Sequence, residues 1–500
     1  MLKAAAARAP AGEALVFGDR RLDYAAYLAC VAGFAHELLA LGARNARVAT
    51  LLPNSIEACV ASFAILAAGA QHAPLNPIYT AREIGDILVD AAPAVIIVDA
   101  SLAELARPIA QRLGAAFIVL GVGIRLLDPS TGTAMSLPEP LPRADMPALL
   151  QYTGGTTGRS KGVNLSHGAI ATNVLQREAL LPIAMDRERV LCVMPLFHSY
   201  AMAMGLFLAV HSRACLVILP RYRPDDLMAA IESERITFFP GGPTIFTGLM
   251  AHADFSRTNW SSVHTCYSGS AALSEETLRR WRDAVGAPVY EGYGQTEAGP
   301  ILSQNPRDAA KAGSVGVALP NTEIQIVDID SGERVLPRGE RGEIRARGPQ
   351  LMSGYRNLPD ETAKSLRNGW LYTGDIGEFD ADGYLYIRDR MKDMIIVGGY
   401  NVYPREIEDV LMLVPGVQEA AVVGRPDAYK GELVYAYVSL RPAHLVTPEE
   451  LLDHCRKNLA RYKLPAAVEI LDSLPKTTIN KLDKPLLRQR AALVTQAAKR

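Results

Sequence analysis

The sequence predicts an α/β protein with a large amino-terminal domain of β-sheets flanked by helices, a β-rich subdomain, and a small α+β domain at the carboxyl terminus. Three observations support this prediction. Helix and strand signals alternate through the first third of the chain, which is typical of a mostly parallel sheet covered by helices. Short strands separated by Gly, Asp and Asn follow Gly313. A compact mixed unit follows residue 393.

The first elements are predicted from apolar spacing and capping residues. Residues 22–41 have the apolar spacing of a helix, and residues 47–52 are a short strand. Thr80 and Glu83 form a capping box before the next helix, because each side chain can bond a free N–H of the other residue. Residues 94–98 are a continuous apolar run, which is typical of a buried parallel strand.

The middle of the chain continues this alternation. Ser166 can cap a helix that extends to about residue 181, and Ser274 opens another helix that ends at Gly286. The remaining elements expected here are strands at 190–194 and 214–219, a helix at 225–234, a segment at 236–240 that leads into a tight turn at 241–244, and strands at 322–327 and 342–346.

The clearest domain boundary is the run of residues 386–393. Past it we expect strands at 394–397, 418–423 and 433–440, and helices at 404–412 and 448–459, the second capped by Thr447 and Glu450. The predicted organisation is a large domain over 1–388, a hinge over 389–393 and a small domain over 394–500.

Composition restricts the class of protein. The chain is 49% hydrophobic and 21% charged, which is in the range of soluble globular proteins, and a length of 500 residues predicts two or more domains. Its 52 basic and 53 acidic side chains give a formal net charge of -1, so nothing indicates a nucleic-acid partner or an anionic membrane. The cysteines are scattered without metal-ligand spacing, which favours a reduced, cytoplasmic protein. They are Cys30, Cys59, Cys192, Cys215, Cys266 and Cys455.

Only residues 191–210 are apolar enough to resemble a membrane span. Pro195, His198 and Ser199 interrupt that stretch, and polar groups inside a span are costly. We therefore predict a buried strand and turn next to a site, and no transmembrane segment. The first twelve residues contain no apolar core of signal-peptide length. The oligomeric state is left open.

Residues 151–162, Gln-Tyr-Thr-Gly-Gly-Thr-Thr-Gly-Arg-Ser-Lys-Gly, have the chemistry of a phosphate-binding loop. Glycines allow close approach of the backbone, hydroxyl and N–H groups donate hydrogen bonds, and the cations attract phosphate. The Gly-Lys-Ser/Thr ending of a P-loop is absent, which disfavours a P-loop NTPase. Alone, the stretch is also compatible with an empty Gly-rich turn. The candidate ligands are Thr153, Gly154, Gly155, Thr156, Thr157 and Lys161.

This stretch resembles, almost residue for residue, the phosphate-binding signature of the adenylate-forming (ANL) superfamily: acyl-CoA synthetases, firefly-luciferase-like enzymes and adenylation domains. The family pattern is Tyr-Thr-Ser-Gly-Thr-Thr-Gly-x-Pro-Lys-Gly, and this chain has Gly154 for Ser and Ser160 for Pro. Recognisable motifs continue as far as Lys484. The resemblance implies the ANL fold, in which the small carboxyl-terminal domain is mobile.

The resemblance implies a nucleotide site made of several motifs. Residues 291–297 resemble the second nucleotide motif, in which Glu297 would bind Mg²⁺, Thr296 would lie near the α-phosphate and Tyr293 beside adenine. Residues 268–273 resemble the loop along the adenine and the acyl carbonyl, which includes Ser270.

Residues 369–375 resemble the ribose motif, in which the carboxylate of Asp375 can accept both ribose hydroxyls. Arg390 matches a family arginine that also reaches the ribose. Taken alone, Asp375 would be an ordinary turn residue and Arg390 half of a surface ion pair.

The carboxyl-terminal motifs imply catalysis and domain rotation. Residues 474–481 resemble the catalytic-lysine motif, with Asn480 where Gly is usual, and Lys481 is the matching lysine. An ammonium between a substrate carboxylate and the α-phosphate neutralises the charge that develops as two anions meet. Lys392 matches the hinge residue. The loop that lines the pantetheine tunnel is matched by Gly398, Gly399 and Tyr400.

The acyl site is implied by residues 195–198. His198 matches a position that guards the acyl pocket and is linked to thioester formation, although a histidine on an apolar run is also compatible with the core. Amino-acid-activating relatives carry a carboxylate beside this position, and this chain has none. The expected pocket residues are Met202, Gly205, Thr244 and Ile245.

The resemblance implies an ATP-dependent acyl-CoA synthetase. A carboxylic acid and ATP would give acyl-AMP and pyrophosphate with Mg²⁺, and coenzyme A would then give acyl-CoA and AMP. Residues 313–316 and 401–404 are most similar to medium- and long-chain fatty-acid ligases, followed by aryl-acid ligases. Two alternatives are a stand-alone adenylating enzyme that loads an acyl or aryl group onto a carrier protein, and a nucleotide-binding scaffold without catalysis.

Overall fold

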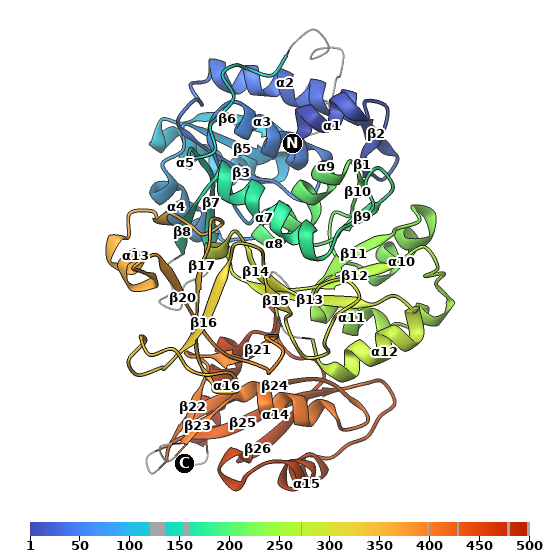
Figure 1. Ribbon diagram of the computed structural model, residues 1–500, viewed down its shortest axis with the longest axis vertical. Coiled ribbons are helices and arrows are strands. Elements are labelled where there is room, and N and C mark those ends of the chain that lie inside the picture. The colour runs from blue at the N-terminus through green and yellow to red at the C-terminus, as the bar shows by residue number, and fades with distance from the viewer. Residues whose placement is uncertain are drawn as a thin grey trace.

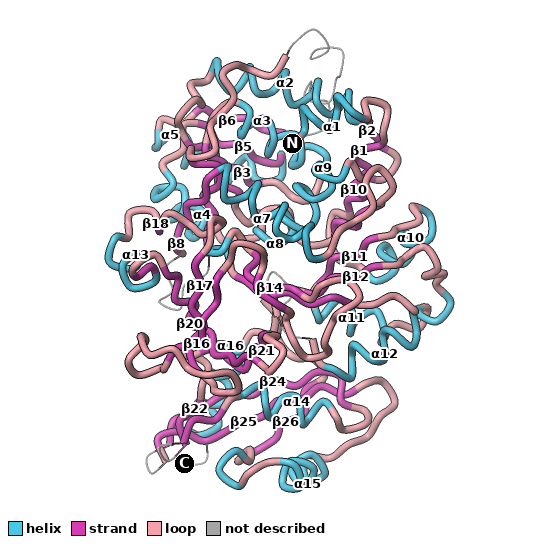
Figure 2. The backbone as a smooth tube through the Cα atoms, in the orientation of Figure 1, coloured by secondary structure: helices cyan, strands magenta, loops and turns pink. Residues whose placement is uncertain are grey.

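The structure, a computed structural model, describes residues 1–120, 136–153, 160–271, 273–397, 400–427, 430–477 and 481–497. In Figure 1 its two large sheets lie side by side in the upper and middle parts of the molecule, the third sheet lies at the lower left, and the last sheet is at the bottom. Helices cover the sheets and also lie between them, as the tube in Figure 2 shows. The α/β prediction, with a smaller carboxyl-terminal domain, is therefore confirmed.

Two large sheets form the upper part of the molecule, and both are mostly parallel. Within the described residues, the first has nine strands, in the order β15 (Val317–Ala318), β14 (Ile301–Gln304), β13 (Val289–Gly294), β12 (Thr265–Ser268), β11 (Phe238–Gly241), β9 (Arg189–Cys192), β10 (Cys215–Ile218), β1 (Glu13–Phe17) and β2 (Arg20–Asp23). The second has seven, again among described residues: β18 (Gly354–Tyr355), β8 (Lys161–Ser166), β7 (Pro147–Thr153), β4 (Gln71–Pro74), β3 (Arg47–Leu51), β5 (Val95–Asp99) and β6 (Ala116–Leu120).

Two smaller sheets follow along the chain. The third is antiparallel and contains β16 (Glu323–Val327), β17 (Gly342–Arg347), β20 (Trp370–Phe379) and β19 (Leu366–Arg367), with β21 (Leu385–Arg390) paired to β20. The fourth contains β23 (Tyr400–Val402), β22 (Ile395–Val397), β25 (Gly431–Leu440) and β24 (Val417–Asp427), with β26 (Ala467–Leu471) parallel to β25.

The helices connect these strands. The longer ones are α1 (Leu2–Arg8), α2 (Tyr24–Ala40), α3 (Ile56–Ala67), α4 (Ala81–Ala91), α5 (Ala103–Leu113), α7 (His167–Leu180), α10 (Pro224–Ser233), α11 (Pro243–Met250), α12 (Glu275–Val285), α13 (Pro359–Ser365), α14 (Pro404–Met412), α15 (Pro448–Asn458) and α16 (Lys484–Ala497). The short ones are η1 (Ala100–Leu102), α8 (Ser199–Ala201), the π-helical turn η3 (Met202–Phe207), α9 (Leu208–Ser212), η4 (Phe255–Arg257), η5 (Thr296–Ala298) and η6 (Arg461–Lys463).

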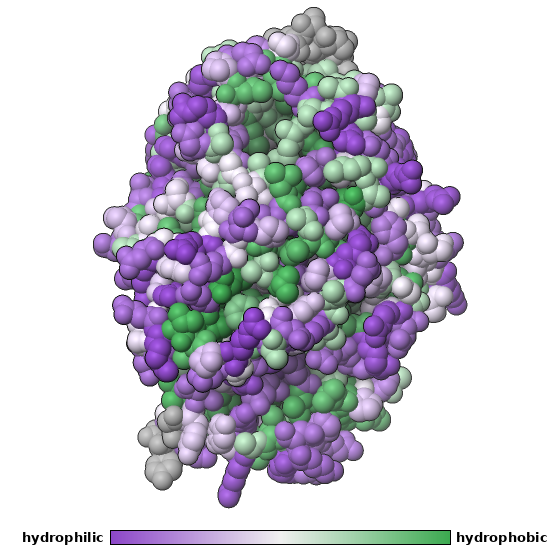
Figure 3. Space-filling view, viewed as in Figure 1, coloured by the Kyte–Doolittle hydropathy of each residue, from purple (hydrophilic) through white to green (hydrophobic). Residues whose placement is uncertain are grey.

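The main core lies between the two large sheets. The helix α3 is buried on all sides except at Glu57, and it contacts β1 of the first sheet and β4 of the second. A helix that is apolar all round needs partners on every side, and this position provides them. Outside the core, polar and charged side chains cover much of the face seen in Figure 3, with apolar patches between them.

Most expected elements are confirmed. The capping box at Thr80 and Glu83 is present, and so is the one at Thr447 and Glu450. Ser166 and Ser274 cap α7 and α12 as expected. The six cysteines, all within the described residues, are buried and form no disulfide bond.

Three expectations need correction. The helix expected from residue 22 begins at Tyr24, because residues 20–23 form β2 and pair with β1. The turn expected at 241–244 is shorter, because Pro243 occupies the first position of α11, where its missing N–H costs nothing. Residues 191–210 are divided among β9, α8, η3 and α9. Among the described residues, no helix has both the length and the apolar character that a membrane crossing needs.

Candidate active site

The candidate site lies where the parallel strands β11, β12 and β13 end, which is where open α/β sheets bind ligands. The β7–β8 hairpin supplies the phosphate loop, and Thr153 lies opposite Lys161 in its register. The two ends of the loop therefore lie side by side. Of the predicted site residues, Gly154, Gly155, Thr156, Thr157, Gly398 and Gly399 lie outside the described residues.

Three residues that are predicted to bind the nucleotide meet at the carboxylate of Asp375. The hydroxyl of Tyr293 donates to Asp375 Oδ2 at 2.7 Å, and Arg390 Nε lies 3.2 Å from Asp375 Oδ1. The pairing of β20 with β21 sets Asp375 directly opposite Arg390. Burial raises the pKa of Asp375, and the charge of Arg390 and the Tyr293 bond oppose that shift. The carboxylate keeps further lone pairs that can accept ribose hydroxyls.

Lys481 belongs to the same cluster, although it comes from the carboxyl-terminal segment. Its backbone N–H donates to Thr477 Oγ1 at 3.2 Å, and the Thr477 N–H donates to its carbonyl at 2.7 Å. Burial lowers the pKa of Lys481 to about 8, aided by the charges of Arg390 and Lys392 and opposed by Asp375. The ammonium is thus close enough to the Asp375 and Arg390 pair for their charges to act on it.

His198 lies near Lys481 rather than in a remote part of the core. Burial and the Lys481 charge lower its pKa to about 3, so the ring is neutral at physiological pH. The Tyr200 N–H donates to His198 Nδ1 at 3.2 Å, which places the ring proton on Nε2. His198 can therefore donate a hydrogen bond to a substrate but is a poor general base.

The residues proposed for the triphosphate and its metal lie on η5 and at the start of β8. Thr296 Oγ1 lies 3.3 Å from the hydroxyl oxygen of Ser199. Glu297 Oε1 accepts a hydrogen bond from the Tyr355 hydroxyl at 2.8 Å. Lys161 Nζ pairs with Glu361 Oε2 at 2.6 Å. The last two partners come from β18 and α13.

The loop after β12 is shaped by a tyrosine. The Tyr200 hydroxyl donates to the carbonyls of Gly241 and Tyr267, at 3.0 and 3.1 Å. A Cβ at Gly269 would meet Tyr200 Cε2 at 2.8 Å, so this position requires glycine. Ser270 follows in the left-handed region, with φ of 72°.

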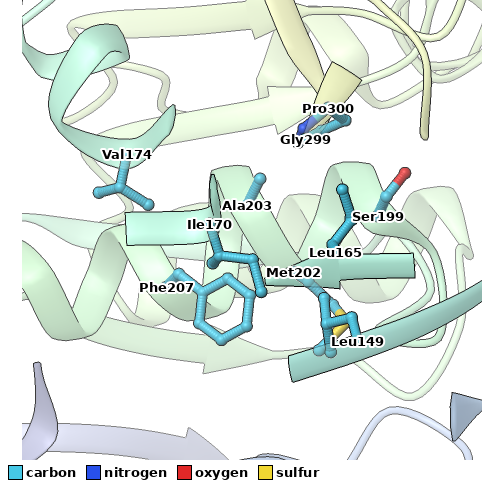
Figure 4. A pocket seen from close by; sticks show the side chains of 10 residues that line it. All are labelled: Leu149, Leu165, Ile170, Val174, Ser199, Met202, Ala203, Phe207, Gly299 and Pro300. Carbon is cyan, nitrogen blue, oxygen red and sulfur yellow. The ribbon is translucent and has the colours of Figure 1, made fainter. Parts of the chain in front are cut away.

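Two small apolar hollows lie on either side of η3. The first is drawn in Figure 4, where side chains of η3, α7 and β7 gather around it, among them Met202, Ile170 and Leu149. The second is lined by Gly205 together with residues of β9 and β11. Of the other predicted pocket residues, Thr244 and Ile245 lie in the first turn of α11 and line neither of these two hollows.

The predicted hinge and tunnel residues lie at the junction with the fourth sheet. Lys392 is in the turn after β21, where the Met391 N–H bonds Gly374 O at 2.9 Å. Next to it, Asp393 Oδ1 pairs with Arg488 Nη2 of α16 at 2.5 Å. Tyr400 is 61% exposed and stacks on Tyr462, with ring centroids 4.8 Å apart.

Several residues of the site were not predicted from the sequence: Ser199, Tyr200, Tyr355, Glu361 and Arg488. Tyr355 hydrogen-bonds Glu297, which is 58 positions away in the chain, and Lys161 pairs with Glu361, which is 200 positions away. No local sequence pattern indicates such contacts.

Glu291 is a further buried carboxyl, in the middle of β13. Burial raises its pKa from 4.5 to about 7, although the Leu273 N–H donates to Oε1 at 3.0 Å. Between these two pH values the folded protein keeps a proton that the unfolded chain loses, so stability falls as the pH rises. Glutamine does not titrate, so the Glu291→Gln variant should escape this loss. We expect the difference in free energy of unfolding, variant minus wild type, to be about 3 kcal/mol larger at pH 8 than at pH 4.

The measurement is the Tm of wild type and variant between pH 4 and pH 8. Exposed Glu340, changed to Gln, is the matched control and should show no pH-dependent difference. A Tm difference between Glu291→Gln and wild type that stayed constant with pH would contradict the expectation.

Comparison with known proteins decides the family. The model of the AMP-binding enzyme family matches residues 2–356, and that of the AMP-binding enzyme carboxyl-terminal domain matches residues 406–481. The chain belongs to the AMP-binding enzyme family. Among its relatives is a long-chain-fatty-acid–CoA ligase of Bacillus subtilis, 36% identical over 522 residues, with 96% of this chain and 92% of the relative covered.

Another relative and a solved structure extend the comparison. A feruloyl-CoA synthase of an Amycolatopsis species is 36% identical over 484 residues, covering 96% of both chains. The crystal structure of ATP-bound MatB from Rhodopseudomonas palustris superposes with a TM-score of 0.89 and 33% identity, covering 96% of this chain and 95% of that one. The names of the ligase relatives and the ANL fold thus agree with the family that the sequence motifs resemble.

Proposed function

We propose that this AMP-binding enzyme is an acyl-CoA synthetase that joins a fatty acid or an aryl acid to coenzyme A, using ATP. The observation that carries the proposal is the cluster of Lys481 with Asp375 and Arg390, because it combines a nucleotide-binding carboxylate with a cation from the carboxyl-terminal segment. The names of the ligase relatives support the same reaction.

In the first step, a substrate carboxylate oxygen attacks the α-phosphorus of ATP. A new C–O–P linkage forms, the bond to the β-phosphate oxygen breaks, and pyrophosphate leaves. Asp375, which Tyr293 and Arg390 hold in place, accepts hydrogen bonds from the ribose. The Lys481 ammonium lies between the two anions and stabilises the charge of the transition state. His198 donates its Nε2–H toward the acyl group.

The site also fits Mg²⁺. Among the described residues, only Tyr355 hydrogen-bonds the Glu297 carboxylate, and it uses Oε1. The other oxygen is a hard anionic donor of the kind that Mg²⁺ prefers. Bound there with the phosphates, the ion would neutralise their charge. Thr296, the adjacent residue, would hydrogen-bond the α-phosphate, and Lys161 the outer phosphates.

In the second step, the sulfur of coenzyme A attacks the acyl carbonyl carbon. The C–S bond forms, the C–O bond to AMP breaks, and the thiol proton is lost to solvent. The division into residues 1–388, 389–393 and 394–500 is part of this proposal. Rotation of the last segment about Lys392 would withdraw Lys481 and bring residues 398–400 to the site. A cytoplasmic location, expected from the scattered cysteines without metal-ligand spacing, belongs to the same proposal.

The two hollows beside η3 favour an apolar acyl group. Their walls are apolar apart from Ser199, Cys192 and the Tyr200 hydroxyl, and neither contains a charged side chain. His198 follows Phe197, where amino-acid-activating relatives tend to carry Phe-Asp, so no carboxylate stands there to pair with the ammonium of an amino acid.

The test is a panel of carboxylic acids from acetate to palmitate, with benzoates and cinnamates, each supplied with ATP, Mg²⁺ and coenzyme A. We expect AMP, pyrophosphate and free acyl-CoA from the longer fatty acids or the aryl acids. If ATP/pyrophosphate exchange occurred without release of acyl-CoA and a carrier protein became acylated, the acyl acceptor would be a carrier-protein thiol instead of coenzyme A. No exchange with any acid would overturn the proposed reaction.

A further inference from the structure

One tyrosine links two parts of the candidate site that are remote in sequence. Tyr355 lies in β18, opposite Val163 of β8, the strand that leaves the phosphate loop. Its hydroxyl donates to Glu297 Oε1 at 2.8 Å. The ammonium nitrogen of Lys161 lies 5.2 Å from the centroid of its ring. The same side chain therefore contacts the proposed metal ligand and the lysine of the phosphate loop.

The backbone around Tyr355 holds the same two parts together. The Met352 N–H donates to the carbonyl of Glu297 at 2.9 Å, and the Arg356 N–H donates to the carbonyl of Gly162 at 2.7 Å. The segment 352–356 thus bridges η5 and the end of the phosphate loop. Tyr355 lies within it, next to Arg356.

Glu361 completes this arrangement from α13. Its Oε2 pairs with Lys161 Nζ at 2.6 Å, and its Oε1 accepts from Lys364 Nζ at 2.8 Å. These two lysines lower the pKa of Glu361 to about 2, so it is ionised at physiological pH. The helix is tied back to β18, since the Tyr355 N–H donates to Thr362 Oγ1 at 2.9 Å.

We propose that Tyr355 is a positioning residue for the binding of Mg·ATP. Its hydroxyl orients the Glu297 carboxylate so that the free oxygen is available to the metal, and its ring keeps Lys161 next to that carboxylate. The inference rests on the proposed function, in which Glu297 binds Mg²⁺ and Lys161 binds phosphate.

The physical reason is the freedom of a carboxylate. Without a partner, the Glu297 side chain can rotate, and each oxygen can be hydrated or bonded elsewhere. A hydrogen bond to one oxygen fixes the direction of the other, and loss of such a partner commonly weakens metal binding 10- to 100-fold. Burial raises the pKa of Tyr355, so its hydroxyl keeps the proton that it donates.

The test variant is Tyr355→Phe, which keeps the ring beneath Lys161 and removes only the hydroxyl. Tyr384→Phe is a matched control. The Tyr384 ring lies 4.5 Å from Lys311 Nζ and its hydroxyl donates to Ala309 O at 2.6 Å, so it has both kinds of contact in another part of the chain. The Tm of each variant reports whether it folds as the wild type does.

The measurement is calorimetric binding of ATP to the full chain without any acid, once with Mg²⁺ and once with EDTA. We expect Tyr355→Phe to bind Mg·ATP about tenfold more weakly and metal-free ATP with unchanged affinity. Glu297→Gln should show the same pattern, and the double variant should be no weaker than Glu297→Gln alone, because both changes remove one interaction. Tyr384→Phe should match the wild type in both conditions.

An equal loss of affinity with Mg²⁺ and with EDTA would overturn the proposal, because it would indicate a purely structural role. Unchanged Mg·ATP affinity in Tyr355→Phe would overturn it as well, while leaving the proposed function intact. A wild-type chain that bound no Mg·ATP would instead overturn the proposed function, and the role of Tyr355 with it.

Discussion

Replacing Lys481 by alanine is expected to lower the rate of acyl-AMP formation by about a thousandfold, because one preorganised charge is lost at the transition state. Conversion of supplied acyl-AMP and coenzyme A to acyl-CoA should change little, because that step does not join two anions at phosphorus. ATP/pyrophosphate exchange measures the first half-reaction, and acyl-CoA release from synthetic acyl-AMP measures the second.

Lys457, an exposed lysine on α15, offers a matched control. Its change to alanine should leave both half-reactions intact. Equal losses of both half-reactions in Lys481→Ala would contradict the role given to Lys481.

The same lysine sets a pH dependence. Its pKa is lowered to about 8 in the folded protein, and the proposed mechanism requires the protonated form. The kcat/KM for ATP in the first half-reaction should therefore fall as the pH rises through about 8, because this parameter reports the free enzyme. Lys481→Arg keeps its charge to far higher pH, so its profile should lack that fall.

A proline at position 392 should have the opposite effect to Lys481→Ala: it should spare the first half-reaction and slow the second. Proline fixes φ and restricts the preceding Met391, so the turn after β21 loses the freedom that a hinge needs. Proline also removes the N–H of residue 392, but among the described residues that N–H donates no hydrogen bond. The substitution therefore breaks no hydrogen bond in the observed arrangement, in which Lys481 is near Asp375. We expect adenylation within about threefold of wild type and thioester formation lower by about a hundredfold, roughly 2.7 kcal/mol.

The two half-reactions are measured separately, as for Lys481. Lys392→Ala is the control, since it removes the side chain and leaves the backbone free, and it should form thioester far better than the proline variant. Unchanged overall turnover in Lys392→Pro would remove this residue as the hinge.

Local chemistry accounts for the elements that the sequence predicts well. The capped helices at Thr80, Ser166, Ser274 and Thr447 depend on bonds within one turn, so a few adjacent residues indicate them. The sequence does not predict the strand β2, because that strand depends on its pairing with β1. It does not predict α11 either, because the Gly-Gly-Pro run is typical of a turn, whereas in the structure Pro243 begins a helix.

The order of motifs in the chain was enough to predict the family, which the family models confirm. The roles given to the phosphate loop, the metal and ribose carboxylates and the late lysine stay predictions. Folding supplied what no local pattern contains. It brought Tyr293 and Arg390 onto Asp375, set Lys481 where their charges act on it, and placed Tyr355 between Glu297 and Lys161. These contacts join segments far apart in the chain, and their geometry depends on sheet register and on burial, which are properties of the folded molecule.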